Sequence, residues 1–69
     1  MGRLYYRDTE KNIPIFIQGL NEETGDVMFT EYASEARDYG GEYFTNAQLG
    51  FLQFHFGEKY PQLKKLKVY

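Results

Sequence analysis

The segment from residue 13 to residue 32 constrains the fold most, because it has the pattern of a β-hairpin. Residues 13–20 are rich in β-branched and aromatic side chains, which suit a strand. Residues 26–32 place Val and Phe on one face and Met, Thr and Tyr on the other, which is the alternation of a strand. The polar residues 21–25 end in Gly25, which can adopt the positive φ angle that closes a hairpin loop. The sequence therefore predicts two antiparallel strands joined by a short loop.

The main helix is predicted to run from about Asn46 to Phe56. Thr45 and Gln48 have the spacing of a capping box, in which the threonine side chain caps the first turn. Gly57 is expected to end the helix. A single helical turn is expected earlier, over residues 33–38.

Two further strands complete the predicted fold. Residues 4–7 suit a short first strand, and residues 64–69 alternate with a period of two, so that Leu66 and Val68 would face inward. We expect one small α+β domain over residues 1–69, with the order β-β-β-α-β. It would contain an antiparallel β-meander, one main helix packed on it and a C-terminal edge strand. The sheet order would be 3-2-1-4, with the last strand parallel to the first if the helix reverses the chain.

Aromatic side chains are expected to supply much of the core. The 69 residues include seven Tyr and six Phe but no cysteine, which excludes disulfides and thiolate ligands. No apolar run approaches the roughly 20 residues that span a bilayer, and no secretory signal is visible. We therefore expect a soluble, cytoplasmic protein without a membrane partner.

The predicted helix has two apolar stripes on nearly opposite sides. The first consists of Ala47, Phe51 and Phe54, and we assign it to the core. The second consists of Leu49, Leu52 and Phe56. Either residues 40–44 and 60–63 cover this second stripe, or it is a candidate protein interface. A homodimer would be the simplest way to bury it, because two-fold pairing needs one self-complementary surface.

The residues that could carry chemistry indicate no catalytic site. Ser34 and His55 are the chain's one serine and one histidine, and each suits a structural position on a helical segment. Glu22, Glu23 and Asp26 lie around the hairpin loop without the spacing of a calcium-binding loop. We predict a protein with no enzymatic activity, no cofactor and no metal site.

Charge is unevenly distributed along a chain whose net charge is −2. Residues 22–42 carry seven acidic side chains against one arginine, and this acidic middle could bind a protein or imitate DNA phosphates. Its candidate interface residues are Glu31, Glu35, Asp38, Tyr39, Glu42 and Tyr43. The C-terminal end offers alternative nucleic-acid contacts at Lys59, Lys64, Lys65 and Lys67. The acidic balance of the whole chain disfavours direct binding to nucleic acid.

The stretch from Phe29 to Tyr39, followed by Tyr43-Phe44-Thr45, resembles small phage and prophage proteins of Gram-positive bacteria. In those proteins a hairpin leads through a short Glu-Ala-Arg/Lys turn into one helix and a last strand. The resemblance covers about residues 13–69 and supplies no functional residues. It implies an accessory role in a mobile genetic element, exercised by binding another protein. The leading hypothesis is a protein-binding module, and the alternative is a nucleic-acid-associated protein.

Overall fold

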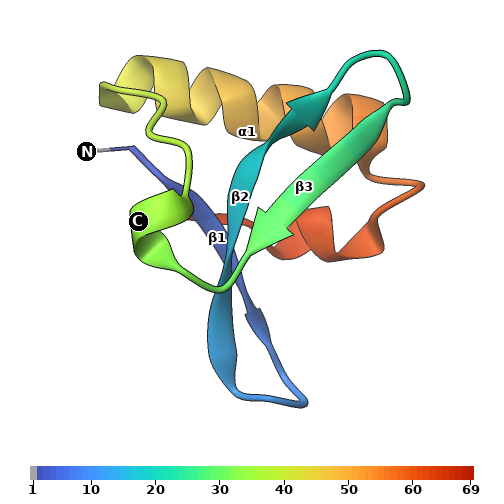
Figure 1. Ribbon diagram of the computed structural model, residues 1–69. Helices are drawn as coiled ribbons and strands as arrows, with labels where there is room; N and C mark the ends of the chain where they lie inside the picture. Colours follow the sequence, from blue (N-terminus) through green and yellow to red (C-terminus); the bar gives the residue numbers. More distant parts are fainter. Residues whose placement is uncertain (1) are drawn as a thin grey trace.

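The computed structural model describes residues 2–69 and confirms the predicted α+β class and β-β-β-α-β order (Figure 1). The strands are β1 (Leu4–Asp8), β2 (Ile13–Asn21), β3 (Asp26–Thr30) and β4 (Lys67–Val68). The helices are α1 (Glu42–Phe56) and two short 3-10 helices, η1 (Ala33–Glu35) and η2 (Pro61–Lys65).

The four strands form one sheet in the predicted order, β3-β2-β1-β4. The expected direction of the last strand is wrong, because β4 runs antiparallel to β1, with Leu4 opposite Val68. The cause lies after α1, where the C-terminal segment turns back beneath the helix through η2 before it reaches the sheet (Figure 1). This additional reversal makes every neighbouring pair of strands antiparallel.

The hairpin of β2 and β3 forms as predicted. The Asn21 side-chain oxygen accepts hydrogen bonds from the backbone N–H groups of Glu23 and Thr24, at 3.0 and 3.3 Å. Gly25 has a φ angle of +71°, and its N–H donates to the carbonyl of Asn21 at 2.8 Å. The loop thus depends on an asparagine at its start and a glycine at its end.

The core lies between the sheet and α1, and its centre is aliphatic rather than aromatic. It consists of Leu4, Ile17, Val27, Leu52, Leu63 and Leu66. Aromatic side chains such as Phe29 and Tyr60 are only partly buried and pack around this centre. Phe16 is buried outside this cluster, with the rings of Tyr5 and Tyr69 packed against it at 5.9 and 5.4 Å between centroids. The expectation of an aromatic core is therefore corrected, since leucine fills the confined centre and rings occupy its margins.

Helix α1 begins at Glu42, four residues before the predicted start, and the proposed capping box is wrong. Gly41 is the N-cap residue, so Thr45 lies inside the first turn. The Thr45 side chain is fully buried, and its hydroxyl donates to the carbonyl of Gly41 at 2.9 Å. A threonine that bonds backward along a helix in this way satisfies its own hydroxyl and does not cap the amino end.

The C-terminal strand is shorter than predicted. Residues 61–65 form η2, which begins at Pro61, a residue suited to the first turn of a helix. Leu66 is buried as expected, whereas Val68 is 44% exposed, which contradicts its predicted inward position. The alternating pattern was misleading because Lys64 and Lys65 belong to η2, which buries Leu63, and the buried Leu66 follows directly after this helix.

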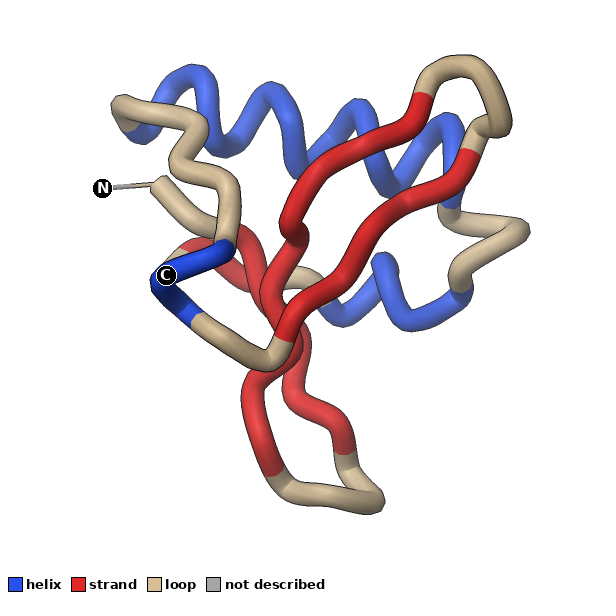
Figure 2. Tube along the Cα trace, in the orientation of Figure 1, coloured by secondary structure: helices blue, strands red, loops and turns tan. Residues whose placement is uncertain are grey.

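The segment that joins η1 to α1 is held against both β2 and the N-terminal residues. The predicted turn over residues 33–38 ends early, at Glu35, because Ala36 is extended. The backbone N–H of Arg37 donates to the carbonyl oxygen of Ile17 at 3.0 Å, and that of Tyr39 donates to the carbonyl oxygen of Gly2 at 2.8 Å. Figure 2 shows this loop passing beside the N-terminal residues on its way to α1.

An ion pair fastens the end of the hairpin to the segment after α1. The Asp26 carboxylate accepts hydrogen bonds from the Lys59 ammonium at 2.7 Å and from the Tyr60 hydroxyl at 2.9 Å. The hydrogen bond from Lys59, followed by those from Thr24 and Tyr60, lowers the pKa of Asp26 to about 2. Both partners of the ion pair are about half exposed, so solvent limits its contribution to stability.

We therefore expect the Asp26 carboxylate, followed by NMR, to titrate near pH 2 in the wild-type protein. Lys59→Met should move its pKa towards the ordinary value of 3.8, and Lys64→Met should leave it unchanged. Because the folded-state pKa is depressed, the stabilisation is present above pH 4 and is lost as the pH falls through about 2. A wild-type pKa near 3.8 would contradict the ion pair.

Candidate functional site

The outward side of α1 carries a surface of exposed aromatic and small residues. We call it the aromatic face, and it consists of Tyr43, Phe44, Ala47, Gly50, Phe51 and Phe54. The four rings are 79%, 66%, 43% and 84% exposed in the order of the sequence. Leu52, on the other side of the helix, has no exposed surface. Tyr43, Ala47, Gly50 and Phe54 follow one line along the helix, because residues three and four apart lie on one side.

The two apolar stripes of the helix therefore have the reverse of their predicted roles. In the stripe proposed as an interface, Leu52 is buried, and Leu49 and Phe56 pack against the core. In the stripe assigned to the core, Phe51 and Phe54 are exposed. The C-terminal segment decides this orientation, since Leu63 and Leu66 join the cluster that contains Leu52. The Gln53 side chain also donates to the carbonyl of Leu63 at 3.0 Å and so ties this side of α1 to η2.

Ring contacts order the two ends of the aromatic face. At the start of α1, the rings of Tyr43 and Phe44 lie 5.4 Å apart in an edge-to-face arrangement. At its end, the exposed His55 ring lies 4.5 Å from Phe51 and 5.0 Å from Phe54. The histidine is thus part of an aromatic group on α1, whereas Ser34 belongs to η1.

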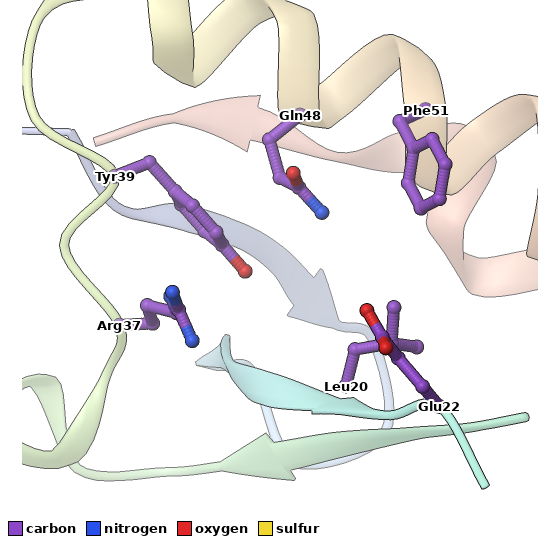
Figure 3. Close-up of a pocket in the computed structure, with 6 residues that line it drawn as sticks. All are labelled: Leu20, Glu22, Arg37, Tyr39, Gln48 and Phe51. Carbon is purple, nitrogen blue, oxygen red and sulfur yellow. The ribbon is translucent and has the colours of Figure 1, made fainter. Parts of the chain in front are cut away.

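A cleft of about 290 Å³ lies beside this face, and Phe51 belongs to both (Figure 3). Gln48 and Phe51 reach into it from α1, Arg37 and Tyr39 from the joining segment, and Leu20 and Glu22 from the end of β2 and the residue after it. The Arg37 guanidinium lies 5.6 Å from the centre of the Tyr39 ring. Burial raises the pKa of Tyr39, so its hydroxyl is protonated at neutral pH. The cleft can therefore accept an apolar side chain that has a polar end.

The predicted acidic interface is divided among several parts of the fold. Tyr43 lies on the aromatic face, and Tyr39 lines the cleft. The carboxylates are exposed, on η1, on the segments that flank it and at the start of α1; they are Glu31, Glu35, Asp38 and Glu42. The Asp38 carboxylate accepts a hydrogen bond from the backbone N–H of Gly40 at 2.9 Å, which lowers its pKa. Asp38 therefore has a role in shaping the turn before α1.

The four lysines proposed as nucleic-acid contacts differ in their surroundings. Lys59 is paired with Asp26, and the same hydrogen bond raises the pKa of the lysine. Lys64 and Lys65 are exposed on η2, and Lys67 is exposed on β4. The pairing of Lys59 joins residues 33 positions apart, so the local sequence offered no signal for it.

In the described part of the chain, residues 2–69, no group of three or more His, Asp and Glu side chains is placed to hold a metal ion. Over the same residues, no helix combines the length and apolar character needed to cross a bilayer.

Comparisons with known proteins return no match to this chain. Neither a family model, nor a curated protein, nor a solved structure matches it. The candidate site is therefore defined by the chain's own residues. The sequence-based prediction left Phe44 out of the candidate interface and assigned Phe51 and Phe54 to the core. The composition of α1 offered one signal that its outward side is a candidate binding surface. None of its 15 residues is Lys or Arg, which is unusual for a helix side that faces water alone.

Proposed function

We propose that this protein is a non-enzymatic, protein-binding accessory module, of the phage or prophage type that the resemblance implies. The observation that carries the proposal is the exposure of four aromatic rings on one side of α1. Together they expose the equivalent of between two and three whole aromatic side chains, or about 500 Å². The largest apolar patch on a typical soluble monomer measures about 300–600 Å² and is often functional, so this face is the natural candidate for a binding surface.

The chemistry of the face supports a protein as the partner. Interface centres are enriched in Tyr and Phe and depleted in charged residues. Glu42, at the first position of α1, is the helix's one acidic or basic side chain other than His55. The adjoining cleft adds polar groups from Arg37 and Gln48 at the edge of the apolar surface. This arrangement of an apolar centre with a polar margin is typical of protein interfaces.

The nucleic-acid alternative has weaker support. Bases stack on exposed rings where cationic side chains also hold the phosphate backbone. Helix α1 contributes neither Lys nor Arg to its rings, and Lys59 is neutralised by Asp26. The other three candidate contacts, Lys64, Lys65 and Lys67, lie on η2 and β4 and not on the helix that carries the aromatic face.

Affinity capture from the native host's lysate tests the proposal with two matched variants. Phe54→Ser removes an exposed ring from the aromatic face, and Tyr32→Ser removes an exposed ring from the acidic middle. We expect Phe54→Ser to lose a partner, identified by mass spectrometry, that the wild type and Tyr32→Ser both retain. Loss with Tyr32→Ser and retention with Phe54→Ser would place the interface in the acidic middle and contradict the proposal.

A further inference from the structure

We infer that the aromatic face binds a second copy of this chain, through antiparallel pairing of two α1 helices about a two-fold axis. The inference rests on the proposed function, because it requires that the face bind protein.

The spacing along α1 is the first line of support. Tyr43, Ala47, Gly50 and Phe54 are separated by four, three and four residues, and this series is the same in both directions. Alternating separations of three and four form the seam of two packed helices. In an antiparallel pair, Tyr43 of one copy would therefore meet Phe54 of the second copy at both ends of the seam. Ala47 would meet Gly50 of the second copy in the middle.

The sizes of these side chains suit two helices that cross. Crossing helices are closest at the crossing point and diverge towards their ends, so the middle needs small residues and the ends need large ones. Gly50 has no side chain, and the place where a Cβ atom would stand faces open space beyond the helix's own backbone. The exposed Ala47 is the next smallest residue on the line. Tyr43 and Phe54 lie about 8 Å along the axis from the midpoint, where their rings can fill the widening gap.

The positions of the two flanking rings, Phe44 and Phe51, are consistent with the same two-fold symmetry. Phe44 and Phe51 lie to one side of the central line, because they are separated by seven residues, or two helical turns. A two-fold axis perpendicular to both helices keeps that side common to the two copies. Phe44 of one copy would then lie near Phe51 of the second copy, and the two clefts would adjoin this side of the interface.

Charge and area also favour a second copy. Glu42 lies off the central line, so no like charges meet along the seam, and antiparallel helices place opposite dipole ends together. Two copies of the exposed rings would bury about 1,000 Å² in total, which is the lower limit for a specific interface. A dimer of this size is expected to be weak and to depend on concentration.

Sedimentation equilibrium of the whole protein tests the inference. We expect the average mass to rise from the monomer value of 8.2 kDa towards twice that value as concentration increases from low micromolar to near millimolar. Ala47→Glu should hold the mass at the monomer value, because it places a charge in the middle of the seam. Gln18→Glu adds the same charge at an exposed position on β2 and should dimerise like the wild type. Circular dichroism should show that both variants stay folded.

A mixing experiment tests the antiparallel direction. Tyr43→Glu and Phe54→Lys should each be monomeric alone, and a mixture of the two should form a heterodimer. In that heterodimer the new carboxylate faces the new ammonium at one end, and the original aromatic pair forms at the other. A parallel pair would place residue 43 beside residue 43, so the absence of a heterodimer would overturn the antiparallel arrangement.

The outcomes separate this inference from the proposed function. A wild type that keeps the monomer mass at every concentration, or a dimer that survives both Ala47→Glu and Phe54→Lys, overturns the inference. If the wild type is monomeric while Phe54→Ser still loses a captured partner, the proposed function stands with a different partner. If the wild type is monomeric and no capture depends on Phe54, both are wrong.

Discussion

Leu52→Ala is expected to lower the free energy of unfolding by about 2–5 kcal/mol. The Leu52 side chain has no exposed surface and packs in the cluster that contains Ile17 and Leu63. Its truncation removes buried apolar surface and leaves a cavity that the surrounding side chains fill only in part. A small domain has about 5–15 kcal/mol of stability in total, so this one change can unfold much of the population at 37 °C. Chemical denaturation followed by circular dichroism measures the loss.

Phe54→Ala is the matched control on the opposite side of the same helix. Phe54 is 84% exposed, so its truncation should change the stability of dilute, monomeric protein by no more than about 0.5 kcal/mol. Phe51, assigned to the core from the sequence, is 43% exposed, so the stability loss of Phe51→Ala should lie between those of Leu52→Ala and Phe54→Ala. If Phe54→Ala costs more than Leu52→Ala, then α1 faces the sheet with its other side.

Gly2→Ala is expected to lower the free energy of unfolding by about 1–3 kcal/mol or more, the second large effect. Gly2 is buried, and a Cβ atom there would overlap both the Thr45 hydroxyl and the carbonyl of Gly40. Neither group can move freely, because the hydroxyl bonds to the carbonyl of Gly41 and Gly40 belongs to the turn before α1. The added methyl group should therefore displace the N-terminal residues from this turn. Thermal unfolding of the variant and the wild type measures the difference.

Gly50→Ala is the control for adding the same methyl group elsewhere. A Cβ atom at Gly50 would contact nothing in the monomer, and alanine favours a helix over glycine by about 1 kcal/mol. In dilute protein this variant should be slightly more stable than the wild type. If Gly2→Ala is equally well tolerated, the close packing of Gly2 against Thr45 is wrong.

The parts of the fold that follow from local chemistry could be predicted. The hairpin loop is specified by two residues within one stretch of five. The Asn21 side chain accepts a hydrogen bond from the loop backbone, and Gly25 adopts a positive φ angle. The order of β1, β2 and β3 in the sheet also followed, because short connections place consecutive strands side by side. The direction of β4 could not be predicted, because it depends on a reversal of the chain through η2. The alternating Lys-Leu-Lys-Val pattern indicates a strand and conceals this reversal.

The orientation of α1 could not be predicted from its own residues. Both sides of the helix are apolar, so hydrophobicity alone allows either to face the sheet. Packing by Leu63 and Leu66, which follow the helix in sequence, selects the Leu52 side. The early start at Glu42 was also hidden, because Thr45 and Gln48 imitate a capping box that the structure does not form. The line of Tyr43, Ala47, Gly50 and Phe54, which are separated by four, three and four residues, can be recognised only when Tyr43 is placed within the helix.

Hydroxyl-radical footprinting at two protein concentrations tests most directly whether the aromatic face is a binding surface. In dilute protein, Tyr43 and Phe54 should be oxidised readily, relative to their intrinsic reactivity, while Leu52 and Leu63 are protected. In concentrated protein, oxidation of Tyr43 and Phe54 should fall, while that of Tyr32, which is exposed away from the face, stays constant. Oxidation of Leu52 as fast as Phe54, or equal oxidation of Tyr43 and Phe54 at both concentrations, would contradict a self-associating aromatic face.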